Sequence, residues 1–427
     1  MNAFPIVQVS DYSAYYAEAR GFAGLAPLDL TAYYAIGPAF LYAVPFRLFG
    51  DGLRVVGLTN LALYVGALIL LYAAALRVFD RPTALLTSIV CCLSLSEMYF
   101  VNLASTETLA TFFIAAIFLA MSGGLRSWKV TLALGALGGL AVYNRSNIFP
   151  MGALAFAQVI LLRRDWREAL AKGAAVQALT IAVTLPLCFF NLRHHDRFTP
   201  LIANPQTLWW GNNPKLAGDF HTYTEVPEDF PLGSYERGRL RKEFAPFYLN
   251  PDLTLYSPTM NPYDMGALKV RYALGWIRQN PSRYLRLIVA RFQLFFFSCT
   301  YGEAPYRTAY SRTDPQQPRW TPAHERLIER ARLPIRRWYQ VLIAGAALGL
   351  IVTAWHYGPR RLLTTTLGLP LLIVAYYSTP FLLTIGANRY HIPILCLCWT
   401  YLAHGLVVVA RALRTTLAPR PLHAPAA

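Results

Sequence analysis

A few ionisable residues occur in a strongly apolar chain, and these residues could carry chemistry. Asp11 opens the stretch DYSAYYAEARGFAG, in which a helix would place Asp11, Tyr15 and Glu18 on one face. A carboxylate presented at the edge of a membrane can act as a general base. It can also simply cap the amino end of the helix, and the spacing alone favours the cap. Asp29, in LAPLDLTAYY, admits the same two interpretations.

Glu107, Arg145 and Arg389 are the other candidates, and each lies at the end of an apolar run. Glu107 begins a run at a place where a carboxylate can either favour the positive end of a helix or serve a site. Arg145 and Arg389 are each the only cation of a short loop. A lone arginine there can snorkel to the interface, but two arginines beside an acidic loop suit the binding of a lipid phosphate.

The composition excludes a soluble enzyme as the default. Of the 427 residues, 55% are hydrophobic and 14% are charged, against roughly 25% charged in an ordinary soluble domain. In a soluble protein a formal charge of +17 would suggest nucleic acid as a partner. Here the cations collect at the ends of apolar runs, where topology signals and lipid phosphates explain them. We expect membrane lipids as partners and no nucleic acid.

The apolar runs predict an all-α polytopic membrane protein with about nine transmembrane helices. The expected spans lie near residues 53–76, 83–99, 104–122, 130–143, 148–162, 173–191, 338–355, 362–378 and 390–410. The chain then divides into a first loop with interfacial helices (1–52), a six-helix core (53–191), a mixed loop cap (192–337), three last helices (338–413) and a tail (414–427).

The bias of Arg and Lys in short loops sets the orientation. The basic set, which should face the cytoplasm, contains Arg77, Arg81, Arg126, Lys129, Arg163, Arg164, Arg167, Lys172, Arg360, Arg361, Arg411 and Arg414. The first loop and the cap then lie on the outer, periplasmic side. The segment 284–297 is short and carries Arg286 and Arg291, so we interpret it as an interfacial or re-entrant helix.

Two further expectations concern the start of the chain and metals. No basic region and apolar core precede Ser10, so neither a signal peptide nor an opening transmembrane helix is visible. We therefore expect that a first helix is missing or that the protein works without one. Cys396 and Cys398 are two residues apart on a predicted helix and face different directions, so we assign no zinc site.

Short motifs in a fixed order resemble a known family. They are Asp11 with Tyr15 and Ala19, Leu48-Phe49-Gly50, Glu107, GLAVYNRSN around Arg145, WWGNNPKLAGDF, and Arg389-Tyr390-His391-Ile392-Pro393. In order and placement they resemble the bacterial family 39 glycosyltransferases of the type C membrane superfamily, to which protein O-mannosyltransferases and lipid A aminoarabinose transferases belong. The resemblance spans nearly the whole chain.

The resemblance implies an inverting transferase that moves a sugar from a polyprenyl-phosphate donor to a lipid, glycan or protein acceptor at the periplasmic face of a bacterial inner membrane. By position, Asp11 matches the first-loop aspartate that acts as general base or organises the acceptor, and Arg145 and Arg389 match positions near the donor phosphate. Supporting roles fall to Tyr15, Asp29, Glu107 and Tyr390. Arg286 and Arg291 would lie in the wall of the prenyl groove.

This sequence departs from the family in two ways. Tyr12 stands where many relatives have a second acidic residue. That argues against a metal or carboxylate-pair mechanism, while a divalent metal is left open. Many relatives also begin with a transmembrane helix before the first loop.

Two other classes of function compete with the transferase. A transporter or flippase for a lipid-linked substrate would fit the many spans interrupted by Gly and Pro. Transporters, however, usually show paired halves and charged groups near the bilayer midplane, whereas here the ionisable residues collect at the outer edge. A noncatalytic scaffold would need no arrangement of Asp11, Arg145 and Arg389.

Overall fold

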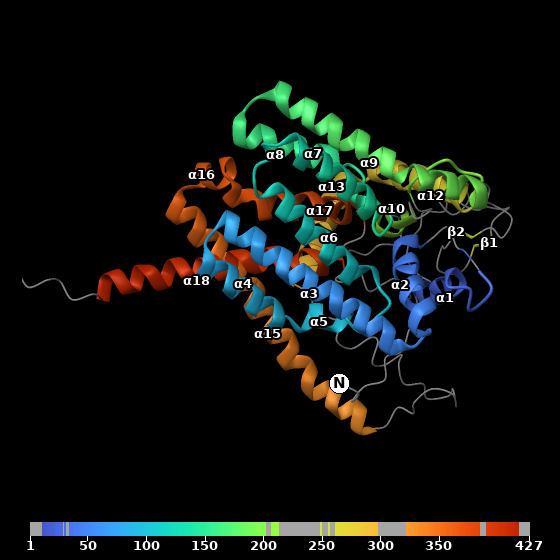
Figure 1. Ribbon diagram of the computed structural model, residues 1–427, viewed down its shortest axis with the longest axis horizontal. Helices are drawn as coiled ribbons and strands as arrows, with labels where there is room; N and C mark the ends of the chain where they lie inside the picture. Colours follow the sequence, from blue (N-terminus) through green and yellow to red (C-terminus); the bar gives the residue numbers. More distant parts are fainter. Residues whose placement is uncertain are drawn as a thin grey trace, which may run out of the picture.

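The computed structural model describes residues 11–28, 30, 34–201, 206–212, 248–249, 255–256, 261–297, 322–384 and 390–417. These residues are almost wholly helical, apart from the two-residue antiparallel strands β1 (Tyr248–Leu249) and β2 (Leu255–Tyr256). The all-α class is therefore confirmed. In Figure 1 the helices α1 (Asp11–Phe22) and α2 (Ile36–Phe49) lie at one end of the long axis, and α16 (Pro359–Thr364) lies at the other.

Five segments are long and apolar enough to cross a membrane. They are α3 (Leu53–Val78), α9 (Trp166–His195), Leu333–Tyr357 of α15 (Pro322–Tyr357), Thr366–Leu383, which joins η2 (Thr366–Gly368) to α17 (Leu369–Leu383), and Ile392–Thr416 of α18 (Ile392–Leu417). The chain is thus a multi-pass membrane protein, as expected from the sequence.

The predicted number of nine spans is not confirmed, because several apolar helices are short. They are α2, α4 (Arg81–Leu93), α6 (Thr106–Met121), α7 (Trp128–Val142) and α8 (Met151–Arg163), each 13 to 16 residues long. A straight span needs about 20 residues. The expected span at 83–99 is interrupted at Ser94, where α4 ends and α5 (Leu95–Phe100) begins.

Small residues allow close packing between the helices. Gly139 of α7 lies against α9 so closely that an added Cβ would be 2.5 Å from the Cβ of Val183. Thr180 of α9 donates from Oγ1 to the carbonyl oxygen of Gly135 at 3.1 Å. On the other side, Gly349 of α15 faces Gly405 of α18 in the same way.

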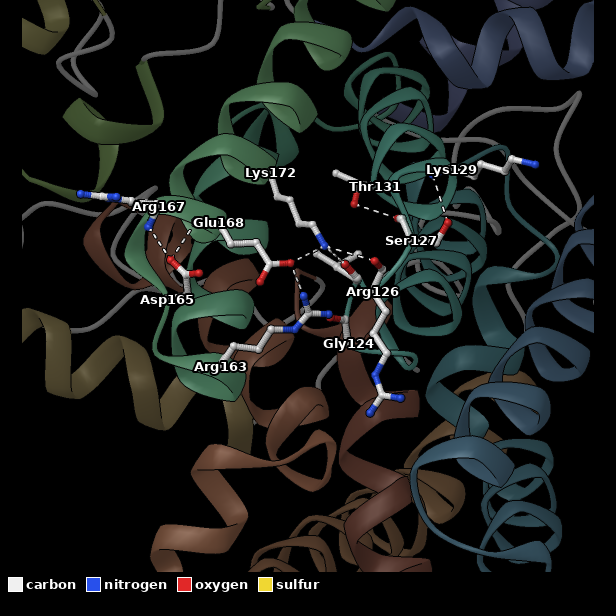
Figure 2. Close-up of polar contacts among 11 residues, drawn as sticks. Gly124, Arg126, Ser127, Lys129, Thr131, Arg163, Asp165, Arg167, Glu168 and Lys172 are labelled. Carbon is white, nitrogen blue, oxygen red and sulfur yellow. Dashed lines mark hydrogen bonds and ion pairs between the residues drawn. The ribbon is translucent and has the colours of Figure 1, made fainter.

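A buried lysine of α9 contacts the loop that joins α6 to α7 (Figure 2). Lys172 is 2% exposed; its Nζ donates to the carbonyl oxygen of Leu125 and lies 2.8 Å from Oε1 of Glu168. Arg163 pairs with the same carboxylate and donates to the carbonyl oxygen of Gly124 at 3.1 Å. Lys172 of α9 and Arg163 at the end of α8 therefore both join their helices to the loop between α6 and α7.

The segment between α9 and α15 contributes α10 (Gln206–Gly211), α12 (Pro262–Gln279) and α13 (Pro281–Phe297). We call these three helices, together with Asn212 directly after α10, the connecting segment. α13 packs against α12, α15 and α17. The predicted cap, 192–337, does not begin and end in loops, because α9 continues to His195 and α15 already starts at Pro322.

Candidate functional site

Arg145 forms a buried ion pair with Glu107. It lies in the turn between α7 and η1 (Ser146–Ile148) and is 8% exposed. Its Nη2 donates to Oε1 of Glu107 at 2.9 Å and to Oγ1 of Thr106 at 2.8 Å. Removing two charges from water costs several kcal/mol per ion, so such a pair adds little net stability. A buried pair of this kind at the end of a helix bundle is therefore a candidate functional site.

Two tyrosines complete the surroundings of Arg145. Its guanidinium carbon is 5.5 Å from the ring centroid of Tyr390, and that ring stacks on Phe381 with centroids 4.7 Å apart. Tyr377 is fully buried, and it interacts electrostatically with Arg145 and Glu107. Its hydroxyl has no hydrogen-bond partner in the described part of the chain.

Further buried polar atoms without partners in the described chain lie close in sequence to Glu107 and Arg145. They are Oγ of Ser105, Oγ1 of Thr108 and Oδ1 of Asn144, each buried and without a partner among the residues described. Buried polar atoms in proteins are nearly always paired, so each exception needs an explanation. The two hydroxyls can donate to an anionic ligand, whereas Oδ1 of Asn144 can only accept from a ligand that carries a donor.

Residues of α2 and α3 hold this region in place. Asn60 donates from Nδ2 to the carbonyl oxygen of Leu103 at 2.7 Å and accepts from the hydroxyl of Tyr42 at 2.7 Å. The amide of Gly37 donates to the carbonyl oxygen of Tyr143 at 2.8 Å, and a Cβ at residue 37 would lie 2.7 Å from that oxygen. Sequence analysis missed Asn60, although a lone amide inside the run LTNLALYVG was a signal.

The first loop contains the helix α1, and one face of this helix is buried. Tyr15 and Glu18 are 7% and 3% exposed, and Asp11 in the first turn is partly exposed. α1 packs on α2, with the rings of Tyr16 and Phe46 5.2 Å apart. Tyr15 belongs to the same buried cluster as Tyr42 and Ala104, the latter two residues before Thr106.

The structure therefore brings together Arg145, Glu107 and Tyr390, and places α1 on the neighbouring helix α2. Asp29 and Arg389 lie outside the described residues, so their part in the site stays a prediction, as does the approach of Asp11 to Arg145. Among the residues described, no group of three His, Cys, Asp or Glu could hold a metal ion.

A second buried carboxylate, Glu97, escaped the sequence analysis. It lies in α5 and is 3% exposed. Its Oε2 accepts from Nε1 of Trp399 at 2.9 Å, and its Oε1 has no hydrogen-bond partner in the parts of the chain described. The sequence signal was a single glutamate inside the apolar run CCLSLSEMYF.

Comparison with known proteins agrees with this architecture. Residues 34–189 match the family model described as dolichyl-phosphate-mannose-protein mannosyltransferase, and this stretch contains Asn60, Glu107 and Arg145. The resemblance to type C membrane glycosyltransferases is confirmed. The family match covers 156 of the 427 residues. No curated protein matches it.

Two solved structures share the fold over 96% of this chain. The Archaeoglobus fulgidus oligosaccharyltransferase in complex with Zn and sulfate superposes with a TM-score of 0.51 at 14% identity, covering 96% of this chain and 46% of the other. The same enzyme tethered to an acceptor peptide gives 0.51 at 12% identity. ArnT from Cupriavidus metallidurans, bound to undecaprenyl phosphate, gives 0.40 at 14% identity, covering 97% and 76% of the two chains.

At such identities the oligosaccharyltransferase likeness establishes the fold alone. This chain spans about half the length of that enzyme, 46% of it.

Proposed function

We propose that this protein transfers a sugar from a polyprenyl-phosphate donor to an envelope acceptor at the periplasmic face of a bacterial inner membrane. The observation that carries the proposal is the buried Arg145, held by Glu107 and adjoined by polar atoms without partners in the described chain. The matched family model is named for a dolichyl-phosphate mannose donor and a protein acceptor, which supports a lipid phosphate as the donor here.

The proposed reaction breaks the bond between the anomeric carbon and the phosphate oxygen. An acceptor hydroxyl or amine attacks the anomeric carbon from the opposite face, the configuration inverts, and the electron pair leaves with the polyprenyl phosphate. Negative charge therefore grows on the phosphate, where a preorganised cation helps most. A guanidinium has five N–H donors in a fixed fork, and Glu107 orients that of Arg145 through Nη2. Arg389 would add a second cation.

Asp11 would act as the general base. It lies in the first turn of α1, at a partly exposed position, and an aspartate there can take the proton of an acceptor hydroxyl within hydrogen-bond reach. Tyr15, Asp29 and Tyr390 would support the site. The sugar and the acceptor would then enter from the end of the bundle where α1 and α2 lie (Figure 1).

The prenyl chain would lie on an apolar surface near α13. Leu285, Val289 and Phe292 follow one another at helical spacing along α13 and are 63%, 59% and 46% exposed. Exposed apolar side chains in such a row contact lipid or another apolar partner. They would guide the donor lipid toward the site.

The deciding experiment follows donor and product in cells with and without the gene. Mass spectrometry of polyprenyl-phosphate sugars and envelope glycans should show a donor that accumulates and a glycan that lacks one residue. Asp11→Asn should then abolish complementation while the purified protein still binds polyprenyl phosphate. Arg145→Gln should weaken that binding by about tenfold or more, as expected for loss of a charge-assisted hydrogen bond.

Arg47→Gln serves as the matched control, because Arg47 is an exposed arginine at the end of α2. It should complement fully and bind the lipid normally. Full transfer by Asp11→Asn would remove the proposed base. Translocation of a labelled lipid-linked sugar in vesicles, with no transfer, would instead support the transporter or flippase.

A further inference from the structure

Side chains from the connecting segment hold the carboxyl end of α17. Nη1 of Arg291 donates to the carbonyl oxygens of Leu382 at 3.2 Å and Leu383 at 3.1 Å. The hydroxyl of Tyr284 and Nδ2 of Asn212 each donate to the carbonyl oxygen of Leu383 at 3.2 Å. The last four carbonyls of a helix lack partners inside the helix. Here Arg291, Asn212 and Tyr284 donate to these carbonyls, and we call the three residues the α17 clamp.

The same arginine also holds the end of α10. Its Nη2 donates to the carbonyl oxygen of Gly211 and, at 2.9 Å, to Oδ1 of Asn212. Gly211 lies so close to the end of α17 that a methyl group at this position would overlap the carbonyl oxygen of Thr384. Arg291 is 3% exposed, and burial lowers its pKa to about 10. It therefore joins three elements, α10, α13 and α17, at one buried point.

A short chain of ring contacts leads from the clamp to the candidate site. Phe381 directly precedes Leu382, and its ring stacks on that of Tyr390, 4.7 Å away at an angle of 15°. Phe295, one helical turn after Arg291, stacks on Phe381 at 6.0 Å. Tyr390 in turn lies beside the guanidinium of Arg145, 5.5 Å from its ring centroid.

We propose that Arg291 is a positioning residue for the site: by fixing the carboxyl end of α17 against the connecting segment, it holds Phe381 and thereby Tyr390 beside Arg145. The role in catalysis rests on the proposed function, whereas the positioning of Tyr390 does not. The guanidinium donates from two separate nitrogens held in one plane, Nη1 to α17 and Nη2 to the end of α10, whereas an ammonium must donate from a single nitrogen. Lysine should therefore substitute poorly, although it keeps the charge.

Hydrogen exchange followed by mass spectrometry tests the positioning without any assay of transfer. In the purified full-length protein, Arg291→Gln should speed the exchange of peptides that cover residues 378–384 and 390–395 by about tenfold or more. Peptides from α6 and α7 should be unchanged. Arg291→Lys should resemble Arg291→Gln. Tyr284→Phe, which removes a single hydrogen bond, should give a smaller change in the same peptides.

Arg278→Gln is the matched control, because Arg278 is an exposed arginine of α12 in the same connecting segment. It should exchange as the wild type does. Unchanged exchange near residues 378–395 in Arg291→Gln would overturn the proposal. So would an equal acceleration across all helices, which would mark Arg291 as a general stabiliser; Tyr284→Phe decides the matter if Arg291→Gln does not fold.

Turnover then tests the link to the reaction. Arg291→Gln should lower kcat for transfer, and this loss should be smaller when Tyr390 is already changed to Ala, because both changes act on one contact. Independent, multiplicative losses in the double variant would refute a route through Tyr390. If the wild type transfers no sugar, the proposed function fails while the exchange result still decides whether the clamp positions Tyr390.

Discussion

Glu107→Gln provides a direct test of the buried pair that anchors the candidate site. The side chains of Arg145 and Glu107 are 7% and 2% exposed, so the change leaves a buried guanidinium without its counter-charge. Removing one partner of a buried ion pair typically costs about 3–5 kcal/mol. Gln keeps an oxygen that can accept from Arg145, so we expect a loss at the lower end of this range, about 3 kcal/mol.

The double variant Glu107→Gln/Arg145→Gln separates pairing from packing. With both charges removed, it should be more stable than the sum of the two single losses predicts, by about 1.5 kcal/mol or more. Asp51→Asn is the control, because the pair Arg20–Asp51 has side chains 41% and 39% exposed. An exposed pair contributes about 0–1 kcal/mol. Thermal unfolding in detergent measures all four variants.

The same unfolding experiment, repeated with polyprenyl phosphate added, tests whether the ion pair of Arg145 and Glu107 contacts the donor phosphate. In Glu107→Gln the guanidinium of Arg145 loses the negative charge of Glu107, so added polyprenyl phosphate should raise Tm more than it does in the wild type, since a ligand that binds the folded state more tightly stabilises it more. If Glu107→Gln loses no more stability than Asp51→Asn, the pair is not buried as described. If polyprenyl phosphate stabilises both proteins equally, Arg145 does not face the phosphate.

Two further predictions concern stability outside the site. Burial lowers the pKa of Lys269 to about 8, below about 10.4 in an unfolded chain. Between these two values the unfolded state therefore binds more protons than the folded state, so the free energy of unfolding should rise with pH. The destabilisation by the buried ammonium is fully present below about pH 8 and should be relieved as the pH rises toward about 10. Lys269→Met should flatten this rise in Tm with pH; an unchanged slope would contradict it. Gly139→Ala should destabilise by about 1–3 kcal/mol in thermal unfolding, because its Cβ would overlap Val183, whereas Gly57→Ala has open space and should not.

Sequence patterns identified the helices but not their interruptions. Apolar runs predict where a chain is buried, and the expected segments near 53–76 and 104–122 correspond to α3 and α6. The break at Ser94 carries no Gly or Pro signal. α15 likewise continues through Pro334 and reaches back to Pro322, because a helix can leave the membrane without ending. Hydropathy indicates whether a segment lies in an apolar or an aqueous environment. It does not indicate the residue at which the helical hydrogen bonding of the backbone stops.

The candidate site was partly predictable for a related reason. Arg145 and Glu107 stood out because each breaks a pattern, of loop charge or of apolar content, and the structure pairs them. Arg291 was expected in the wall of a lipid groove, but its contacts with Leu382, Leu383 and Asn212 place it inside a joint between helices. Those partners lie more than 75 residues away in sequence, so no local spacing could indicate them.

The dipoles of α6 and α7 explain why a charged pair is stable at this position. Glu107 lies in the first turn of α6, where the helix dipole favours an anion. Arg145 follows the end of α7, and its amide donates to the carbonyl oxygen of Ala141, so the cation lies at the end of a helix that favours positive charge. Each charge is therefore stabilised by its own helix as well as by its partner. An anion arriving at Arg145 would meet a cation whose orientation is already fixed, and fixed dipoles help a reaction because they need no reorganisation when charge moves. The interruption between α7 and α8, which shortens both helices, thus places Arg145 at a helix end, where the proposed function needs a cation for the donor phosphate.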